Sequence, residues 1–175
     1  MNKSAFSFEC EICEMAKHRC SSFSSQNYHA TKPFKLIHSD VWGPSRVATV
    51  NGKRWFVSFI DDHTRLTWVY LLKDKGEVKH MFEAFYVMVE TQFHEKIQIF
   101  RSDNGRECFN DHLGNFFTFK GIVHQSSCPN TPQQNGVAER KNRHLMEVTR
   151  ALIFKSGVPK FLWGEALLTS TYLIN

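Results

Sequence analysis

Residues Arg54–Leu72 read RWFVSFIDDHTRLTWVYLL and contain the clearest structural signal in the chain. Their two apolar runs are rich in the β-branched and aromatic residues that favour strands. Asp61 to Thr64 separate the runs with the polar residues of a tight turn. Upstream, an Asn-Gly pair at 51–52 marks another turn, and FKLIHSDVW (34–42) alternates apolar and polar residues as a strand does. The sequence therefore predicts three strands joined by short turns and antiparallel to one another.

Beyond these strands the apolar residues recur at helical spacing, from Lys75 to about His94. The side chains that form this stripe are Val78, Phe82, Phe85, Val89 and Phe93. Two short strands are predicted at IQIF (97–100) and GIVHQ (121–125). Three further helices are expected at about residues 108–120, 133–155 and 161–173. This alternation of strands and helices predicts an α/β fold with a mixed sheet.

The composition is that of one folded domain. The chain has 175 residues, 42% of them hydrophobic, and its 16 phenylalanines predict an aromatic core. A formal net charge of +5 suits a polyanionic partner such as nucleic acid without requiring one. No apolar run has the length of a membrane span and no signal peptide is evident, so we expect a soluble, intracellular protein without a membrane partner. Five cysteines at irregular spacing favour a reducing compartment over a disulfide framework.

The first 32 residues differ from the rest of the chain. Residues 1–32 are polar and Ser-rich, and SSFSSQNYHATKP (21–33) is typical of a linker, so we expect the compact domain to cover 33–175. Cys10 and Cys13 form a Cys-x-x-Cys pair, which can supply two of the four ligands of a structural zinc site. Both ends suggest a piece of a longer protein, with a possible truncation at the C-terminus.

Three acidic residues stand in contexts that suit phosphoryl transfer. Asp40 lies near the end of the first predicted strand, Asp103 follows IQIF, and Glu139 lies in the first turns of the long helix, with 35 residues between the last two. Cutting and joining of phosphodiesters is assisted by two divalent ions about 3.5–4 Å apart. Because Mg²⁺ prefers oxygen ligands, such a site needs about three carboxylates from different elements. We therefore predict that these three residues hold two Mg²⁺ or Mn²⁺ ions.

Ordinary structural roles remain open for these acids. Asp before Asn-Gly is a common turn signal, and Glu139 can form an ion pair with Arg143 one helical turn later. Other acidic residues compete for the same assignment, and we interpret them as turn, loop or helix-start residues. They are Asp61, Asp62, Glu107 and Asp111.

Amides and cations surround the start of the long helix. Backbone N–H groups at a helix start attract phosphate, and Lys and Arg displace counterions from DNA. The predicted DNA contacts are Gln133, Asn135, Arg140, Lys141 and Arg143. The alternative for each cation is a solvated helix face. Because phosphate contacts hold DNA without reading its sequence, we expect weak target selectivity.

Several phrases match one known family, in the order in which that family has them. They are SDVWGP (39–44), FIDDHTR (59–65), RSDNG (101–105), TPQQNGVAERKNR (131–143) and FLWGEA (161–166). With them, the chain from about Cys10 onward resembles the integrase segment of a Copia-type LTR retrotransposon Pol polyprotein. The resemblance implies a ribonuclease-H-like fold, with a mixed five-stranded sheet flanked by helices, and catalysis by Asp40, Asp103 and Glu139.

The resemblance also implies how such a site works. Asp40 and Asp103 would bind one ion, Asp40 and Glu139 the other, and the 3′-hydroxyl of retroelement DNA would attack target DNA. It implies DNA and further copies of the chain as partners, with function in the nucleus after a cytoplasmic stage. In this family two histidines upstream of the cysteines complete a zinc site, so Cys10 and Cys13 are interpreted as the remnant of that module. A catalytically inactive DNA-binding remnant, and more weakly a nuclease for RNA–DNA hybrids, remain as alternatives.

Overall fold

A computed structural model of the chain describes residues 30–103, 111–126 and 135–175. The predicted zinc ligands Cys10 and Cys13 and the predicted DNA contact Gln133 lie outside these residues. The strands are β1 (Leu36–Trp42), β2 (Trp55–Asp61), β3 (Thr67–Leu72), β4 (Ile99–Ser102) and β5 (Val123–Ser126). The α-helices are α2 (Val78–Met88), α3 (Asp111–Lys120), α4 (Gly136–Ser156) and α5 (Trp163–Ile174). Short helical turns are η1 (Lys75–Glu77), η2 (Val89–Phe93) and η5 (Lys160–Leu162).

The five strands form one mixed sheet in the order β3-β2-β1-β4-β5. β2 is antiparallel to both β1 and β3, as the short turns of the sequence predict. β4 is parallel to both β1 and β5. Parallel neighbours need long crossover connections, and α2 with η2 supplies one between β3 and β4, while α3 connects β4 to β5. β1 is the third of the five strands in this order and is therefore the central one, with β2 on one side and β4 on the other.

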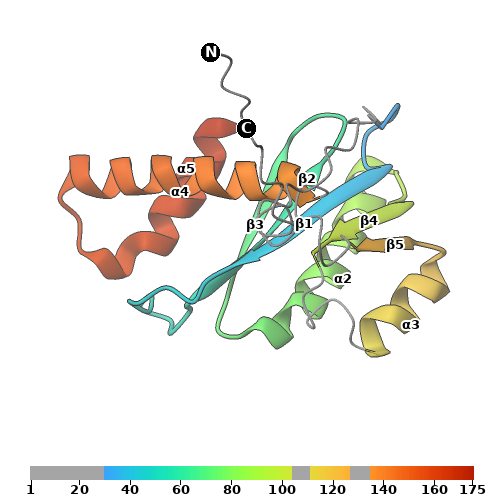
Figure 1. Ribbon diagram of the computed structural model, residues 1–175, viewed down its shortest axis with the longest axis horizontal. Helices are drawn as coiled ribbons and strands as arrows, with labels where there is room; N and C mark the ends of the chain where they lie inside the picture. The colour runs from blue at the N-terminus through green and yellow to red at the C-terminus, as the bar shows by residue number, and fades with distance from the viewer. Residues whose placement is uncertain (1–29, 104–110, 127–134) are drawn as a thin grey trace, which may run out of the picture.

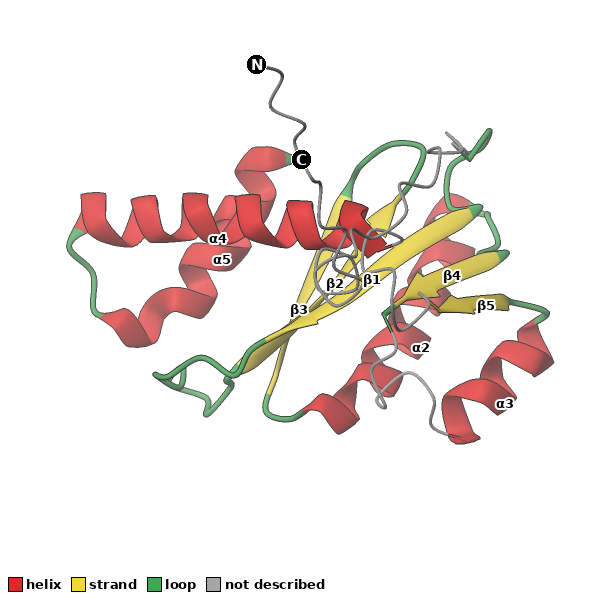
Figure 2. Cartoon of the chain, viewed as in Figure 1, coloured by secondary structure: helices red, strands yellow, loops and turns green. Residues whose placement is uncertain are grey.

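The helices cover the two faces of the sheet unequally (Figure 1). α2 and α3 lie on one face, and α4 begins over the middle of the other face and runs outward beyond the sheet, where α5 returns beside it (Figure 2). The side chains of β1 alternate between these faces, as those of any strand do. Ile37 packs in the core under α2, whereas Trp42 packs in the smaller core with Trp163 of α5.

Aromatic rings dominate the larger core, as the phenylalanine content predicts. Phe59 of β2 is fully buried at its centre, and its ring lies within 6.3 Å, centroid to centroid, of four others. These rings belong to Tyr70, Phe82, Phe85 and Phe100. Such pairs add to the free energy of burial through edge-to-face and offset stacking.

The helical hairpin of α4 and α5 has a defined turn. Gly157 follows the last residue of α4, is left-handed at φ 65° and donates its N–H to the Ile153 carbonyl. The Trp163 Nε1 donates to the Val47 carbonyl at 2.9 Å, which ties the start of α5 to the β1–β2 connection. Within the described residues, no helix is both long enough and apolar enough to cross a membrane.

Phe59→Ala should lower the free energy of unfolding by about 3–5 kcal/mol, because it leaves a cavity among the rings that contact Phe59. Chemical denaturation followed by circular dichroism measures this change. Phe119→Ala is the matched control, since that ring is 85% exposed, and its effect should stay within about 0.5 kcal/mol. Equal effects of the two substitutions would contradict this account of the core.

Candidate active site

The strand register brings Asp40 and Asp103 to the same place. β1 and β4 are parallel, with Leu36 opposite Ile99 and His38 opposite Arg101. Continuing this register by two residues sets Asp40 opposite Asp103, the first residue after β4. Both then belong to the face of the sheet on which α4 packs, because side chains alternate along a strand. The predicted pairing of these two carboxylates therefore follows from the sheet topology.

α4 brings the third carboxylate to this face. Its buried residues are Gly136, Ala138, Asn142, Leu145 and Thr149. The Asn142 Nδ2 donates to the Asp40 Oδ2 at 2.9 Å, so the second turn of α4 lies directly on the site. Glu139 precedes Asn142 by three residues and therefore shares its side of the helix. The Glu139 side chain itself is exposed.

Asp40 carries an electrostatic signature of this arrangement. Its pKa is raised to about 6 from the 3.8 that is normal for the group, chiefly by burial and to a lesser degree by the negative charges of Asp103 and Glu139. The hydrogen bonds from the Asn142 amide and the Val41 N–H oppose this shift, because they favour the ionised form. Asp103 and Glu139 are thus close enough to act on the Asp40 carboxylate.

The carboxylates are nevertheless not gathered into a finished metal site. Among the residues that the structure describes, no three His, Cys, Asp or Glu side chains are arranged to hold a metal ion. Like charges repel and separate when no cation lies between them. The donor set itself fits a hard divalent cation, since it offers carboxylate oxygens from three different elements. Burial is the main cause of the raised pKa of Asp40, and a bound cation would oppose this shift by favouring the ionised carboxylate.

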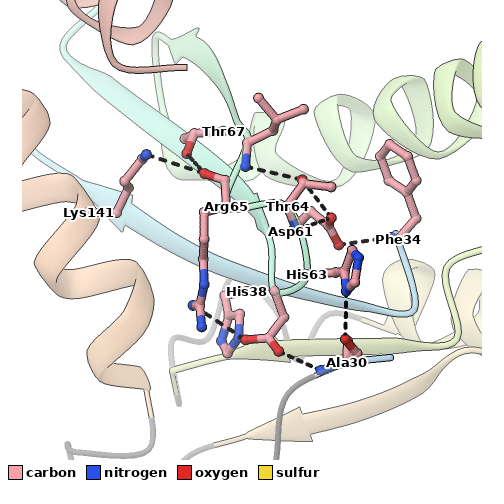
Figure 3. A network of polar contacts seen from close by, with 11 residues as sticks. Ala30, Phe34, His38, Asp61, His63, Thr64, Arg65, Thr67 and Lys141 are labelled. Carbon is pink, nitrogen blue, oxygen red and sulfur yellow. Dashed lines mark hydrogen bonds and ion pairs between the residues drawn. The ribbon is translucent and has the colours of Figure 1, made fainter. Parts of the chain in front are cut away.

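The rival acids Asp61 and Asp62 have structural roles, as predicted. Asp61 accepts hydrogen bonds from the Phe34 N–H at 2.8 Å and from the N–H and hydroxyl of Thr64 at 2.9 and 2.7 Å, which closes the β2–β3 turn (Figure 3). Asp62 accepts a bond from the Ala30 N–H at 2.8 Å. These bonds attach the first described residues to the sheet.

His38 is paired with Asp62 in the same region. It is buried between the sheet and the turn, and its Nε2 lies 2.9 Å from the Asp62 Oδ1. Burial lowers the pKa of His38, although its bond to Asp62 and the charge of Asp62 act in the opposite direction. His38 therefore connects the β2–β3 turn to β1. It precedes Asp40 by two residues in β1, so both side chains belong to the same face of the sheet.

The predicted DNA contacts occupy three kinds of environment. Arg140 and Arg143 are exposed on α4 and suit contact with phosphate. Lys141 is half-buried, and its Nζ donates to the Arg65 carbonyl at 3.3 Å. Asn135 is only 1% exposed, and its Nδ2 donates to the Ser39 carbonyl at 3.2 Å. Its side chain therefore joins α4 to β1 instead of facing a ligand, which departs from its expected role as a DNA contact.

Asn142 is the functional residue that sequence reasoning missed. It is 3% exposed, and its Oδ1 has no hydrogen-bond partner, while its Nδ2 is bonded to Asp40. A signal was present, because residues three apart in a helix share one face and Asn142 follows Glu139 by three. The identity of its partner could not be deduced, since Asp40 is 102 residues away in the chain.

Comparison with known proteins agrees with this geometry. Residues 30–132 match the family described as "Integrase core domain", and the chain belongs to that family. The match contains Asp40 and Asp103, whereas Glu139 lies beyond its end.

Two curated relatives from plants cover nearly the whole chain. It is 39% identical over 166 residues, 95% of its length, to the "Retrovirus-related Pol polyprotein from transposon TNT 1-94" of Nicotiana tabacum. It is 38% identical over 175 residues, 100% of its length, to the corresponding protein "from transposon RE1" of Arabidopsis thaliana. The chain spans 12% of the length of each. These relatives confirm the resemblance to retrotransposon Pol polyproteins of the Copia type.

Solved structures confirm the ribonuclease-H-like fold. A chain of the simian T-cell lymphotropic virus intasome, in complex with PP2A regulatory subunit B56 gamma, superposes with a TM-score of 0.68 at 16% identity. The alignment covers 85% of the present chain and 50% of that one. The HTLV-2 integrase catalytic core domain, in complex with magnesium in a trimeric form, gives a TM-score of 0.62 at 16% identity and covers 84% and 88%.

Asp40→Asn should stabilise the metal-free protein at neutral pH. Because the pKa of Asp40 is higher in the fold than in the unfolded chain, the folded state binds more protons between pH 3.8 and about 6. The free energy of unfolding therefore falls as the pH rises through this window, and the loss is complete at pH 7. We expect Asp40→Asn to be more stable than the parent by about 1–3 kcal/mol at pH 7, with the difference vanishing below about pH 4. Denaturation at both pH values checks this, and a pH-independent difference would contradict it.

Asn142→Ala should lower the free energy of unfolding by about 1.5–3 kcal/mol at pH 7, because it removes a hydrogen bond to an ionised carboxylate. The loss should shrink at pH 4 and in an Asp40→Asn background, where no charge remains to be stabilised. Asn115→Ala, at an exposed position of α3, is the matched control and should change stability by less than about 0.5 kcal/mol.

Proposed function

We propose that this chain is an integrase catalytic core that joins the 3′-hydroxyl ends of retroelement DNA to a phosphodiester of target DNA. The observation that carries the proposal is the position of Asp40. It continues the β1–β4 register toward Asp103 and is bonded to the helix that carries Glu139. Three carboxylates from three elements at one place suit phosphoryl transfer assisted by metal ions.

Each residue has a distinct task in this reaction. Two Mg²⁺ or Mn²⁺ ions, when bound, stabilise the charge on the attacked phosphate and on the attacking and leaving oxygens. Asp40 is the central ligand, because both other carboxylates influence its charge. Asn142 holds the Asp40 carboxylate in place through its bond to Oδ2. Asp103 and Glu139 would complete the donor set from two further elements, one from the end of β4 and one from α4.

DNA and further copies of the chain are the proposed partners. The exposed Arg140 and Arg143 flank the carboxylates on α4, where they can hold the DNA backbone without reading its sequence. The structural neighbours support both partners, since one is a chain of an intasome and the other is a trimeric form in complex with magnesium. Integration of DNA would take place in the nucleus.

A catalytically inactive DNA-binding remnant is the second candidate. One observation favours it, namely that the described residues hold no group of three metal-binding side chains in a finished arrangement. The two candidates differ in their response to divalent cations. An integrase core must bind Mg²⁺ or Mn²⁺ through its carboxylates, whereas a remnant binds DNA with or without them.

Asp103→Asn should lower strand transfer by at least about a hundredfold, because an amide is a poorer ligand for a hard cation than a carboxylate. A gel assay of labelled DNA ends joined to plasmid, with Mg²⁺ or Mn²⁺, measures the reaction. Glu95→Gln removes the same charge from an exposed position and should leave the rate unchanged. An Asp103→Asn protein as active as its parent would overturn the assignment.

Mn²⁺ should raise the melting temperature of the parent chain, because a ligand that binds only the folded state stabilises it by mass action. The shift should grow with the Mn²⁺ concentration and be strongly reduced in Asp40→Asn and Asp103→Asn. Differential scanning fluorimetry measures it, with Glu95→Gln again as the charge-matched control. A parent chain that binds DNA but shows no such shift favours the inactive remnant.

A further inference from the structure

The β2–β3 turn presents a cation next to the candidate active site. Arg65 lies in this turn with φ at 64°, in the left-handed region that L side chains rarely adopt. Its Nη1 lies 3.5 Å from the Oδ1 of the buried Asp62, which orients the guanidinium group. The Arg65 side chain is still 44% exposed, so it can contact a ligand.

A second cation reaches the same turn from α4 (Figure 3). The half-buried Lys141 directs its Nζ to the Arg65 carbonyl at 3.3 Å. Among the described residues, no carboxylate forms an ion pair with Lys141. The β2–β3 turn thus has the Lys141 ammonium at its backbone and the partly exposed Arg65 guanidinium at its side, and each can contact a phosphate of one DNA strand.

A DNA strand can span the distance between the carboxylates and the pair formed by Arg65 and Lys141. Lys141 follows Glu139 by two residues in α4, on a different side of the helix. Asp61, at the start of the turn, pairs with Ile37, which precedes Asp40 by three residues in β1. Three strand residues measure about 10 Å, and one DNA strand rises about 3.4 Å per nucleotide. A strand held at the carboxylates would reach the turn about three nucleotides away.

We propose that Arg65 and Lys141 together bind the phosphate backbone of a DNA strand that lies in the candidate active site. This inference rests on the proposed function, since it takes DNA as the substrate. A phosphate is the fitting anion, because Arg presents a planar fork of donors and Lys a point charge, and neither contact depends on the base sequence. The turn thereby adds a DNA contact outside α4, at a residue that no helix-based prediction includes.

The test is the salt dependence of DNA binding by the full chain in EDTA, where no transfer occurs. Fluorescence anisotropy with a short labelled duplex gives the affinity between about 50 and 200 mM NaCl. Arg65→Gln and Lys141→Gln should each reduce the slope of log K against log salt by about 0.9, which corresponds to about eightfold weaker binding near 0.1 M. The double variant should lose at least as much as either single one.

Two controls separate this site from a general effect of charge or folding. The double variant Arg150→Gln/Lys155→Gln removes the same charge from exposed positions farther along α4, and its slope should match that of the parent. Arg150 is a close match for Lys141, because the side chain of each donates a hydrogen bond to a backbone carbonyl. Arg150 donates to Met146, as Lys141 donates to Arg65. Melting temperatures measured alongside identify any variant that is partly unfolded. In that case Lys141→Met, which keeps an apolar stem, replaces Lys141→Gln.

Several outcomes would overturn the proposal. One is an unchanged slope in both single variants, and another is an equal loss in the Arg150/Lys155 control. A loss at Lys141 alone would also do so, because the pair would then not act together. The proposed function fails separately, through an active Asp103→Asn protein or a parent without strand transfer. Neither of those results alters the salt slope in EDTA, so the two failures can be distinguished.

Discussion

The structure depends on a constraint at β1, the central strand of the sheet. β1 makes hydrogen bonds to β2 on one side and to β4 on the other, and helices pack on both of its faces. Alternate residues must therefore suit two different interiors. Ile37 enters the aromatic core under α2, while His38 and Asp40 face the side on which α4 begins. A carboxylate in such a position is unstable when ionised unless it receives hydrogen bonds or a cation.

α4 resolves this constraint and thereby forms the site. The Asn135 amide bonds to the Ser39 carbonyl, and the Asn142 amide bonds to the Asp40 carboxylate. These two contacts, about two helical turns apart, hold the start of the helix against β1. Glu139 lies between them in the sequence and is carried to the edge of the site as a consequence. The same bonds that stabilise a buried charge thus determine where the third carboxylate stands.

The surroundings of the site are divided by charge. Acidic side chains lie at the centre, where burial, with smaller contributions from the charges of Asp103 and Glu139, raises the pKa of Asp40 to about 6. Positive charge lies around it, on the exposed cations of α4 and on the pair formed by Arg65 and Lys141. An anionic centre attracts divalent cations, and a cationic rim attracts a polyanion. Both are needed by a reaction in which a DNA backbone is held against metal ions.

The sequence by itself determined the elements and suggested the chemistry. Alternating apolar residues located β1, two runs rich in β-branched and aromatic residues located β2 and β3, helical periodicity located α2 and α4, and the contexts of Asp40, Asp103 and Glu139 predicted a donor set. The tertiary structure alone decided which side chains support those donors. Asn142 bonds to a residue 102 positions away, Asn135 is buried against β1, and Arg65 meets Lys141 across 76 positions. Such contacts arise from the pairing of β1 with β4 and the packing of α4 on the sheet. Local propensity and periodicity report only on near neighbours in the chain and carry no information about them.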